Sequence, residues 1–110
     1  MLQGRRREVQ QAVIFIWEHL KEELSVNRIA REVGLSPNYL STEFKRTMNE
    51  GIKKYIVRAR MEKAAKMLRE TSMMIYEIAE ETGFSNYRYF TETFYEYYQM
   101  PPSAYREAKP

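Results

Sequence analysis

The sequence predicts an all-α fold of about seven helices, in which two helix-turn-helix subdomains are joined by one long linker helix. Three observations predict it: apolar residues recur at helical spacing, serines and glycines separate the helical segments, and one short pattern occurs twice. The chain has 110 residues, which fits a single domain 1–110. Within it we expect a first subdomain with its leading helix at 8–48, the linker helix at 49–71 and the second subdomain at 72–107.

The first subdomain begins with an amphipathic helix. Its apolar residues recur at the spacing of one helix face and are Val9, Ala12, Val13, Ile16, Trp17 and Leu20. Ser25 is a suitable N-cap for a short second helix, which Gly34 would end because glycine readily adopts the left-handed conformation. Ser36 would cap the third helix, and Pro37 suits its first position because the N–H it lacks has no helical acceptor there.

The linker helix is predicted from Ile52 to about Glu70, a stretch without glycine or proline. It carries two apolar stripes, the first formed by Ile52, Tyr55, Ile56 and Ala59, and the second by Val57, Met61, Ala64, Ala65 and Leu68. One helix with two such stripes can pack against two different bodies.

The pattern of the first subdomain then recurs. Ile29-Ala30 and Gly34-Leu35-Ser36 reappear as Ile78-Ala79 and Gly83-Phe84-Ser85, and Leu40 and Phe44 correspond to Phe90 and Phe94. Each copy predicts a short helix, a glycine turn and a second helix that is presented outward. A solenoid of plain helical hairpins is the structural alternative, but it usually needs three or more similarly spaced copies. Pro101 and Pro102 would end the last long helix, and a short final turn would follow at 103–106.

Charge is distributed unevenly along the chain, with net values of +2 over residues 1–48, +4 over 49–70 and −3 over 71–110. A basic middle favours a polyanionic partner, although a solvated helix surface explains it equally well. A linker helix of about 20 residues spans roughly 30 Å, and successive major grooves on one face of DNA are about 34 Å apart. We therefore expect two recognition helices, at about 37–48 and 86–98, to enter adjacent major grooves of double-stranded DNA.

The sequence resembles the AraC/XylS family of bacterial transcription regulators over about residues 10–106, and most of all the output domains of two-component response regulators. The matching residues are Ile29-Ala30, Gly34-Leu35-Ser36-Pro37, Tyr39-Leu40, Phe44-Lys45, Tyr55-Ile56, Arg60, Ala64, Leu68, Ile78-Ala79, Gly83-Phe84, Tyr89-Phe90, Phe94, Pro102 and Tyr105-Arg106. The resemblance implies sequence-specific binding of double-stranded DNA, transcription activation, contact with RNA polymerase and a cytoplasmic location. It also implies an excised domain that is a monomer by itself and belongs to a regulator that can dimerise, with a short stand-alone member of the family as the alternative.

On the first recognition helix, we expect Asn38, Ser41 and Thr42 to contact base edges and Lys45 and Arg46 to hold phosphates. The alternative for the first three is ordinary solvated helix surface, and Asn38 has a further alternative as a cap near the helix start.

On the second recognition helix, we expect Tyr87, Arg88 and Glu92 to contact bases, and Asn86 and Thr91 to contact phosphate. Arg88 suits guanine O6 and N7. Glu92 could accept a hydrogen bond from cytosine N4 or orient Arg88, and we favour the second role because a carboxylate near phosphates is costly unless it is paired. Relatives often have basic residues where this chain has Tyr95-Glu96-Tyr97-Tyr98, so the second reader should hold phosphate less strongly than the first.

On the linker helix, we expect Lys53 and Lys54 to contact phosphates, whereas Arg60 is better explained as a structural anchor. The sequence has no cysteine, no nucleophile–base pattern, no glycine-rich phosphate loop and no metal-ligand spacing, so we expect no enzyme activity, catalytic residue, metal or cofactor. RNA is a less suitable ligand because its deep, narrow major groove excludes helices. A bundle that binds other proteins is the main alternative function.

Overall fold

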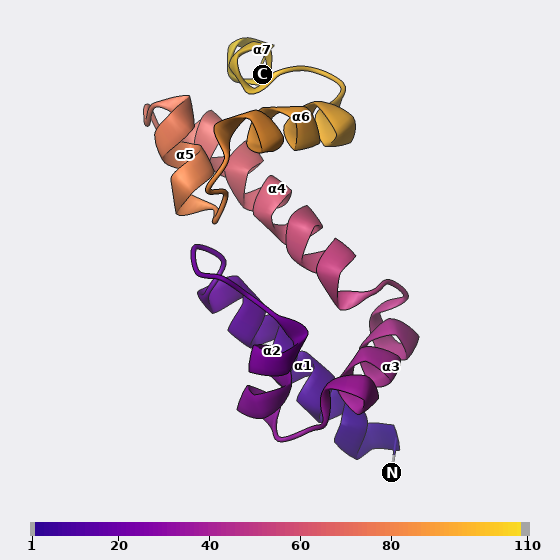
Figure 1. Ribbon diagram of the computed structural model, residues 1–110. Helices are drawn as coiled ribbons and strands as arrows, with labels where there is room; N and C mark the ends of the chain where they lie inside the picture. Colours follow the sequence, from indigo (N-terminus) through magenta and orange to yellow (C-terminus); the bar gives the residue numbers. More distant parts are fainter. Residues whose placement is uncertain (1, 109–110) are drawn as a thin grey trace. The chain divides into compact units, whose positions relative to one another are not determined.

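The computed structural model describes residues 2–108, and over these residues it confirms the expected all-α fold with one long linker helix (Figure 1). Its helices are α1 (Leu2–Glu18), α2 (Val26–Val33), α3 (Pro37–Met48), α4 (Ile52–Glu70), α5 (Ile75–Glu81), α6 (Tyr87–Tyr98) and α7 (Pro102–Ala108). Contacts divide the chain into two compact units, Met1–Val57 and Arg58–Pro110, so the boundary falls inside α4. None of the helices over 2–108 has both the length and the apolar character that crossing a membrane requires.

In the first unit, α1, α2 and α3 pack against one another. Its core contains Val9, Ala12, Phe15, Ile16, Leu20, Ile29, Ala30, Leu40 and Phe44, together with Tyr55 and Ile56 from the start of α4. Trp17 was expected on the apolar face, but it is 38% exposed and its indole N–H donates a 2.9 Å hydrogen bond to the hydroxyl of Tyr55. Phe15 lies outside the six-residue apolar stripe of the sequence, yet it is buried. The face that α1 packs against the core is therefore wider than that stripe indicates.

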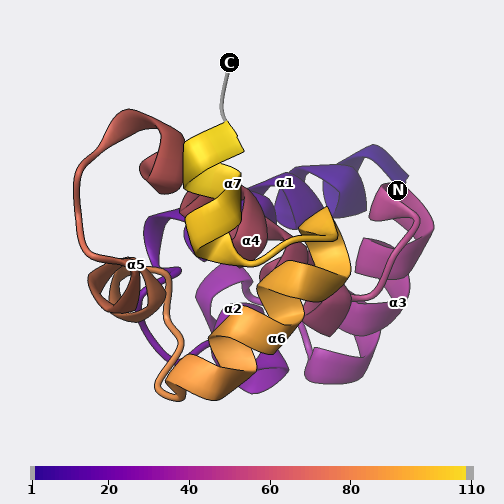
Figure 2. The same ribbon diagram turned by 90° about the horizontal axis from the view of Figure 1, so that it is seen from above.

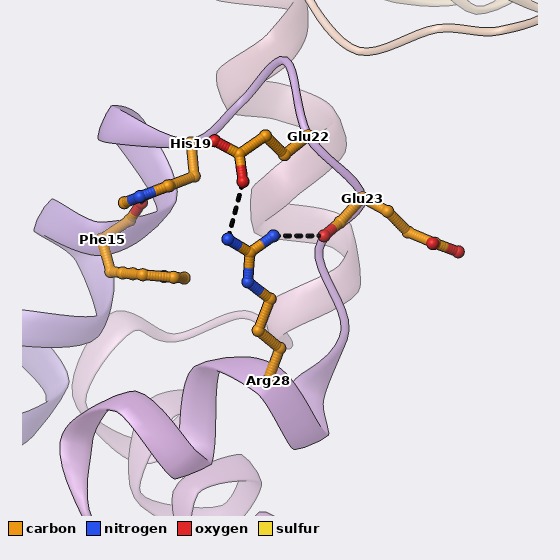
Figure 3. A network of polar contacts seen from close by, with 5 residues as sticks. All are labelled: Phe15, His19, Glu22, Glu23 and Arg28. Carbon is orange, nitrogen blue, oxygen red and sulfur yellow. Dashed lines mark hydrogen bonds and ion pairs between the residues drawn. The ribbon is translucent and has the colours of Figure 1, made fainter.

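The connection from α1 to α2 is fixed by Arg28 (Figure 3). Its guanidinium donates hydrogen bonds to the carboxylate of Glu22 at 2.6 Å and to the backbone carbonyl of Glu23 at 2.9 Å. It also lies 5.3 Å from the centre of the Phe15 ring, which stacks on His19. The hydrogen bond from Arg28 lowers the pKa of Glu22. One side chain of α2 therefore holds the loop and the end of α1 together.

The expected helix boundaries of the first helix-turn-helix are confirmed. The Ser25 hydroxyl accepts a hydrogen bond from the backbone N–H of Arg28, and Gly34 ends α2 at φ 77°. Ser36 caps α3 by accepting from the N–H of Tyr39 at 3.2 Å, with Pro37 as the first helical residue. These caps fix where α3 begins and therefore which of its side chains face outward.

The unbroken helix α4 has the bounds that the sequence predicts. The four residues of its first apolar stripe are buried: Ile52, Tyr55, Ile56 and Ala59. In the second stripe Met61, Ala64, Ala65 and Leu68 are buried, whereas Val57 is only half-buried.

The second unit contains the rest of α4 with α5, α6 and α7, and Figure 2 shows α6 and α7 side by side. Gly83 adopts a positive φ of 93° at the turn after α5, and its counterpart in the first unit, Gly34, has a positive φ of 77°. The cap of α6 is Asn86, whose side-chain oxygen accepts from the N–H of Tyr89 at 2.8 Å. The second copy has one extra residue after its serine, because Ser36 and Ser85 are 49 positions apart whereas Leu40 and Phe90 are 50 apart. This residue shifts the capping role from Ser85 to the next position.

Helix α7 is longer than the short turn expected at 103–106. Its Tyr105 hydroxyl accepts a 2.7 Å hydrogen bond from the guanidinium of Arg69. Arg106 donates to the backbone carbonyls of Leu68 at 3.1 Å and Thr71 at 3.2 Å. Because the last carbonyls of a helix lack helical donors, Arg106 satisfies the C-terminal end of α4.

The repeat extends further than the sequence pattern indicates. Phe44 meets Tyr55 edge-on with ring centres 5.4 Å apart, and Phe94 meets Tyr105 edge-on at the same distance. Both members of the second pair stand fifty positions after those of the first. Helix α7 therefore closes the second unit as the start of α4 closes the first, and α4 serves both as a closing helix and as a leading helix.

Candidate nucleic-acid interface

Helices α3 and α6 each bury one face and present the opposite face to solvent. The buried residues are Leu40, Glu43 and Phe44 in α3, and Phe90, Thr93 and Phe94 in α6. All the site residues that the sequence predicts on α3 are exposed: Asn38, Ser41, Thr42, Lys45 and Arg46. On α6, Tyr87, Arg88 and Glu92 are exposed, Thr91 is half-buried, and the capping residue Asn86 is exposed. Each helix therefore gathers its predicted residues on one outer surface, which we call a reader face.

On the reader face of α3, the Thr42 hydroxyl donates a 3.0 Å hydrogen bond to the backbone carbonyl of Asn38. Its proton is used in this bond, so a base meets the Thr42 oxygen as an acceptor and its methyl group as an apolar contact. The alternative role of Asn38 as the helix cap is filled by Ser36. The side chain of Asn38 is therefore not needed as the helix cap and is open to a contact with a base.

Arg46 has a second role that the sequence analysis missed. Its guanidinium donates a 2.7 Å hydrogen bond to the carboxylate of Glu43, whose side chain is only 8% exposed. The two residues line a recess of about 180 Å³ with Arg6 and Thr47. The signal was present in the sequence, because Glu43 stands three positions after the buried Leu40 and so lies on the inward side of the helix.

On the reader face of α6, Arg88 and Glu92 form an ion pair with 3.1 Å between Nε and Oε2. Their side chains are 86% and 62% exposed, so the pair stands in solvent. The Thr91 hydroxyl donates to the carbonyl of Arg88 at 3.0 Å, and it would have to rotate before it could donate to a phosphate. The side-chain oxygen of Asn86 is used in capping, which leaves its amide nitrogen as a donor.

The two reader faces differ in charge at equivalent positions, fifty residues apart. Lys45 and Arg46 on α3 correspond to Tyr95 and Glu96 on α6. The first face therefore ends in two cations, whereas the second ends in a phenol and a carboxylate. The expectation that the second reader holds phosphate less strongly rests on this same difference and stays a prediction.

On α4, Lys53 and Lys54 are exposed, as a phosphate-holding role requires. Arg58 is instead paired with Glu62 at 2.8 Å. Arg60 is half-buried within reach of an electrostatic interaction with Tyr89, and burial lowers the pKa of its guanidinium. This environment supports the structural role expected for Arg60. Over residues 2–108, no group of three or more histidine, aspartate or glutamate side chains is placed to hold a metal ion.

Comparison with known proteins identifies similar chains. Residues 29–108 match the model of a family described as the helix-turn-helix domain. Regulatory protein PocR of Salmonella typhimurium is 35% identical over 100 residues, which cover 91% of this chain and 33% of that protein.

Two solved structures have the same fold over nearly all of this chain. One is the C-terminal domain of AraT, a response regulator from Geobacillus stearothermophilus, with a TM-score of 0.88, 31% identity, and coverage of 93% of this chain and 85% of that one. The other is a transcriptional regulator from Chromobacterium violaceum, described by its AraC-type DNA-binding domain, with a TM-score of 0.88, 29% identity and coverage of 98% of both chains. The chain spans about a third of the length of PocR and of several other curated relatives that it matches.

Proposed function

Because this chain belongs to the family of AraC-type helix-turn-helix domains, we propose that it binds double-stranded DNA at a specific sequence and acts in bacterial transcription regulation. The single observation that carries the proposal is the repeated reader face, in which a capped helix holds a set of polar side chains outward over an apolar core. Helices with such faces fit the major groove of B-DNA, which is about 12 Å wide.

The contacts divide into base readers and phosphate holders. In this proposal, Asn38, Ser41 and Thr42 contact base edges from α3, and Tyr87 and Arg88 do so from α6. Phosphates are held chiefly by the cations Lys45, Arg46, Lys53 and Lys54, with smaller contributions from Asn86 and Thr91. The exposure of all these residues except the half-buried Thr91 supports the division. The two readers occupy adjacent major grooves and are joined by α4.

The relatives support a proposal for the setting of the whole protein. The likeness to the C-terminal domain of a response regulator supports a role as the output domain of a longer regulator, controlled by an upstream domain. Such a regulator dimerises through its other domain and contacts RNA polymerase to activate transcription, whereas this domain by itself is a monomer. It works on chromosomal DNA in the cytoplasm and has no enzyme activity.

The test is a titration of labelled bacterial genomic fragments with the isolated chain, followed by fluorescence anisotropy at two salt concentrations. We expect saturable binding by some fragments, competed poorly by random duplex, and a steep loss of affinity with salt. Lys45→Ala should weaken binding to all fragments. Lys21→Ala, which removes the same charge from the loop after α1, is the matched control and should change little. Equal binding to all fragments would contradict sequence specificity, and no binding at low salt would favour a protein-binding bundle.

A further inference from the structure

The guanidinium of Arg88 is held through its Nε, while its two terminal nitrogens face solvent. Its Nε donates to the Oε2 of Glu92, one helical turn further along α6. Over residues 2–108, no protein partner contacts its two terminal nitrogens, and the side chain is 86% exposed. The planar guanidinium carries five N–H donors in a fixed fork, so the bond at Nε sets the direction in which the terminal pair points.

We propose that Glu92 is a positioning residue that makes Arg88 a selective reader of guanine and keeps it from the phosphate backbone. The inference rests on the proposed function and adds a specificity-determining role for a residue that touches the base only through another. Two terminal N–H groups match guanine O6 and N7, which is the bidentate contact that distinguishes this base in the major groove.

The charge of Glu92 explains why Arg88 reads a base instead of holding a phosphate. An arginine that is free to move near DNA is attracted to phosphates anywhere along the duplex. A carboxylate bonded to it makes the pair neutral, and any movement toward the backbone either breaks the pair or brings Glu92 close to the phosphates. Arg88 therefore contributes discrimination between sequences and little general affinity.

Arg88 is the only cation of α6, which covers Tyr87–Tyr98. The next exposed outer residues of the helix include Tyr95 and Glu96. On α3, the position equivalent to Glu92 is Thr42, whose hydroxyl bonds to the carbonyl of Asn38. The first reader therefore has no arginine–carboxylate pair at these positions, and the arrangement proposed here is confined to the second reader.

The test compares three variants by selection from a random duplex library and by affinity for a random duplex. Arg88→Ala should reduce the preference for one guanine by roughly 5- to 150-fold, the usual range for a lost bidentate contact. Glu92→Gln should reduce the same preference several-fold while raising affinity for random duplex. Glu96→Gln is the matched control, because it removes the same charge from the same helix. It should raise affinity for random duplex but leave the guanine preference intact.

In the double variant Arg88→Ala/Glu92→Gln, the guanine preference should equal that of Arg88→Ala alone, and circular dichroism should show that all variants fold. The proposal is overturned if Glu92→Gln keeps the full guanine preference, or if it loses a cytosine preference at another position, which would make Glu92 a direct reader. A wild-type chain that selects no motif would overturn the proposed function as well. A wild-type motif that does not depend on Arg88 would overturn only this inference.

Discussion

The guanidinium of Arg46 donates a 2.7 Å hydrogen bond to the carboxylate of Glu43, a side chain that is 8% exposed on the inner side of α3. A residue at the edge of the reader face thus also satisfies a buried charge. Arg46→Ala should lower the free energy of unfolding by about 1–2 kcal/mol, because it leaves the Glu43 carboxylate without this donor. Urea denaturation measures this loss.

The neighbouring residue provides the control for that change. Lys45→Ala removes the same charge without a buried partner and should leave the free energy of unfolding within about 0.5 kcal/mol of wild type. Both substitutions should weaken DNA binding at all sequences. If Arg46→Ala were as stable as Lys45→Ala, the ion pair would have no structural role.

A second prediction separates a base reader from a phosphate holder. Thr42→Ala should relax the preference at one or two base pairs, at a cost of roughly 1–3 kcal/mol in discrimination, because it removes a positioned acceptor and a methyl group. Lys53→Ala should weaken all sequences alike and reduce the slope of log affinity against log salt by about 0.9. Titrations at four salt concentrations on matched and mismatched duplexes measure both quantities. An unchanged salt slope in Lys53→Ala would remove that lysine from the interface.

A third prediction concerns how α7 is held. Arg106→Ala removes the donors to the carbonyls of Leu68, in the last turn of α4, and of Thr71, just after it. Its loss should destabilise the second unit by about 1–2 kcal/mol. Amide hydrogen exchange should show faster exchange in α6 and α7 and little change in α1 and α2. Lys66→Ala, an exposed substitution on α4, is the control. Equally faster exchange in both units would contradict this account.

Much of the fold could be predicted from the sequence, because local signals decide it. The bounds of α4 follow from a long segment without glycine or proline, and the ends of α2 and α3 follow from Ser25, Gly34 and Ser36. The exposure of the reader residues follows from helical spacing relative to Leu40.

The rest depends on contacts between segments far apart in the sequence. The bond between Trp17 and Tyr55 joins residues 38 positions apart, and no local pattern predicts it. The same holds for the anchoring of α7 by Arg106, which reaches back to Leu68. The sequence offsets place one extra residue after Ser85, but which residue then caps α6 depends on the backbone, and the shift of the cap to Asn86 was not predicted.

A fourth prediction tests α4 as a rigid connection. Inserting two alanines between Val57 and Arg58, at the boundary of the units, would rotate the second reader by about 200° and move it roughly 3 Å along the helix axis. Each unit keeps its own packing, and alanine is the strongest helix former, so circular dichroism should be unchanged. Footprinting should then show protection of one half-site only, with affinity close to that of a single reader. Protection of both half-sites at near-original affinity would mean that the connection bends freely.

The most direct test of the central claim is selection of duplex sites from a random library by the isolated wild-type chain at low salt. Two reader faces joined by the linker helix α4 predict a single asymmetric motif with two blocks. The block centres should be about 10 base pairs apart, the spacing of successive major grooves on one face of DNA. The block bound by the second reader should contain the guanine that Arg88 reads. A motif with one block would contradict binding by two readers, and recovery of no motif would contradict sequence-specific DNA binding itself.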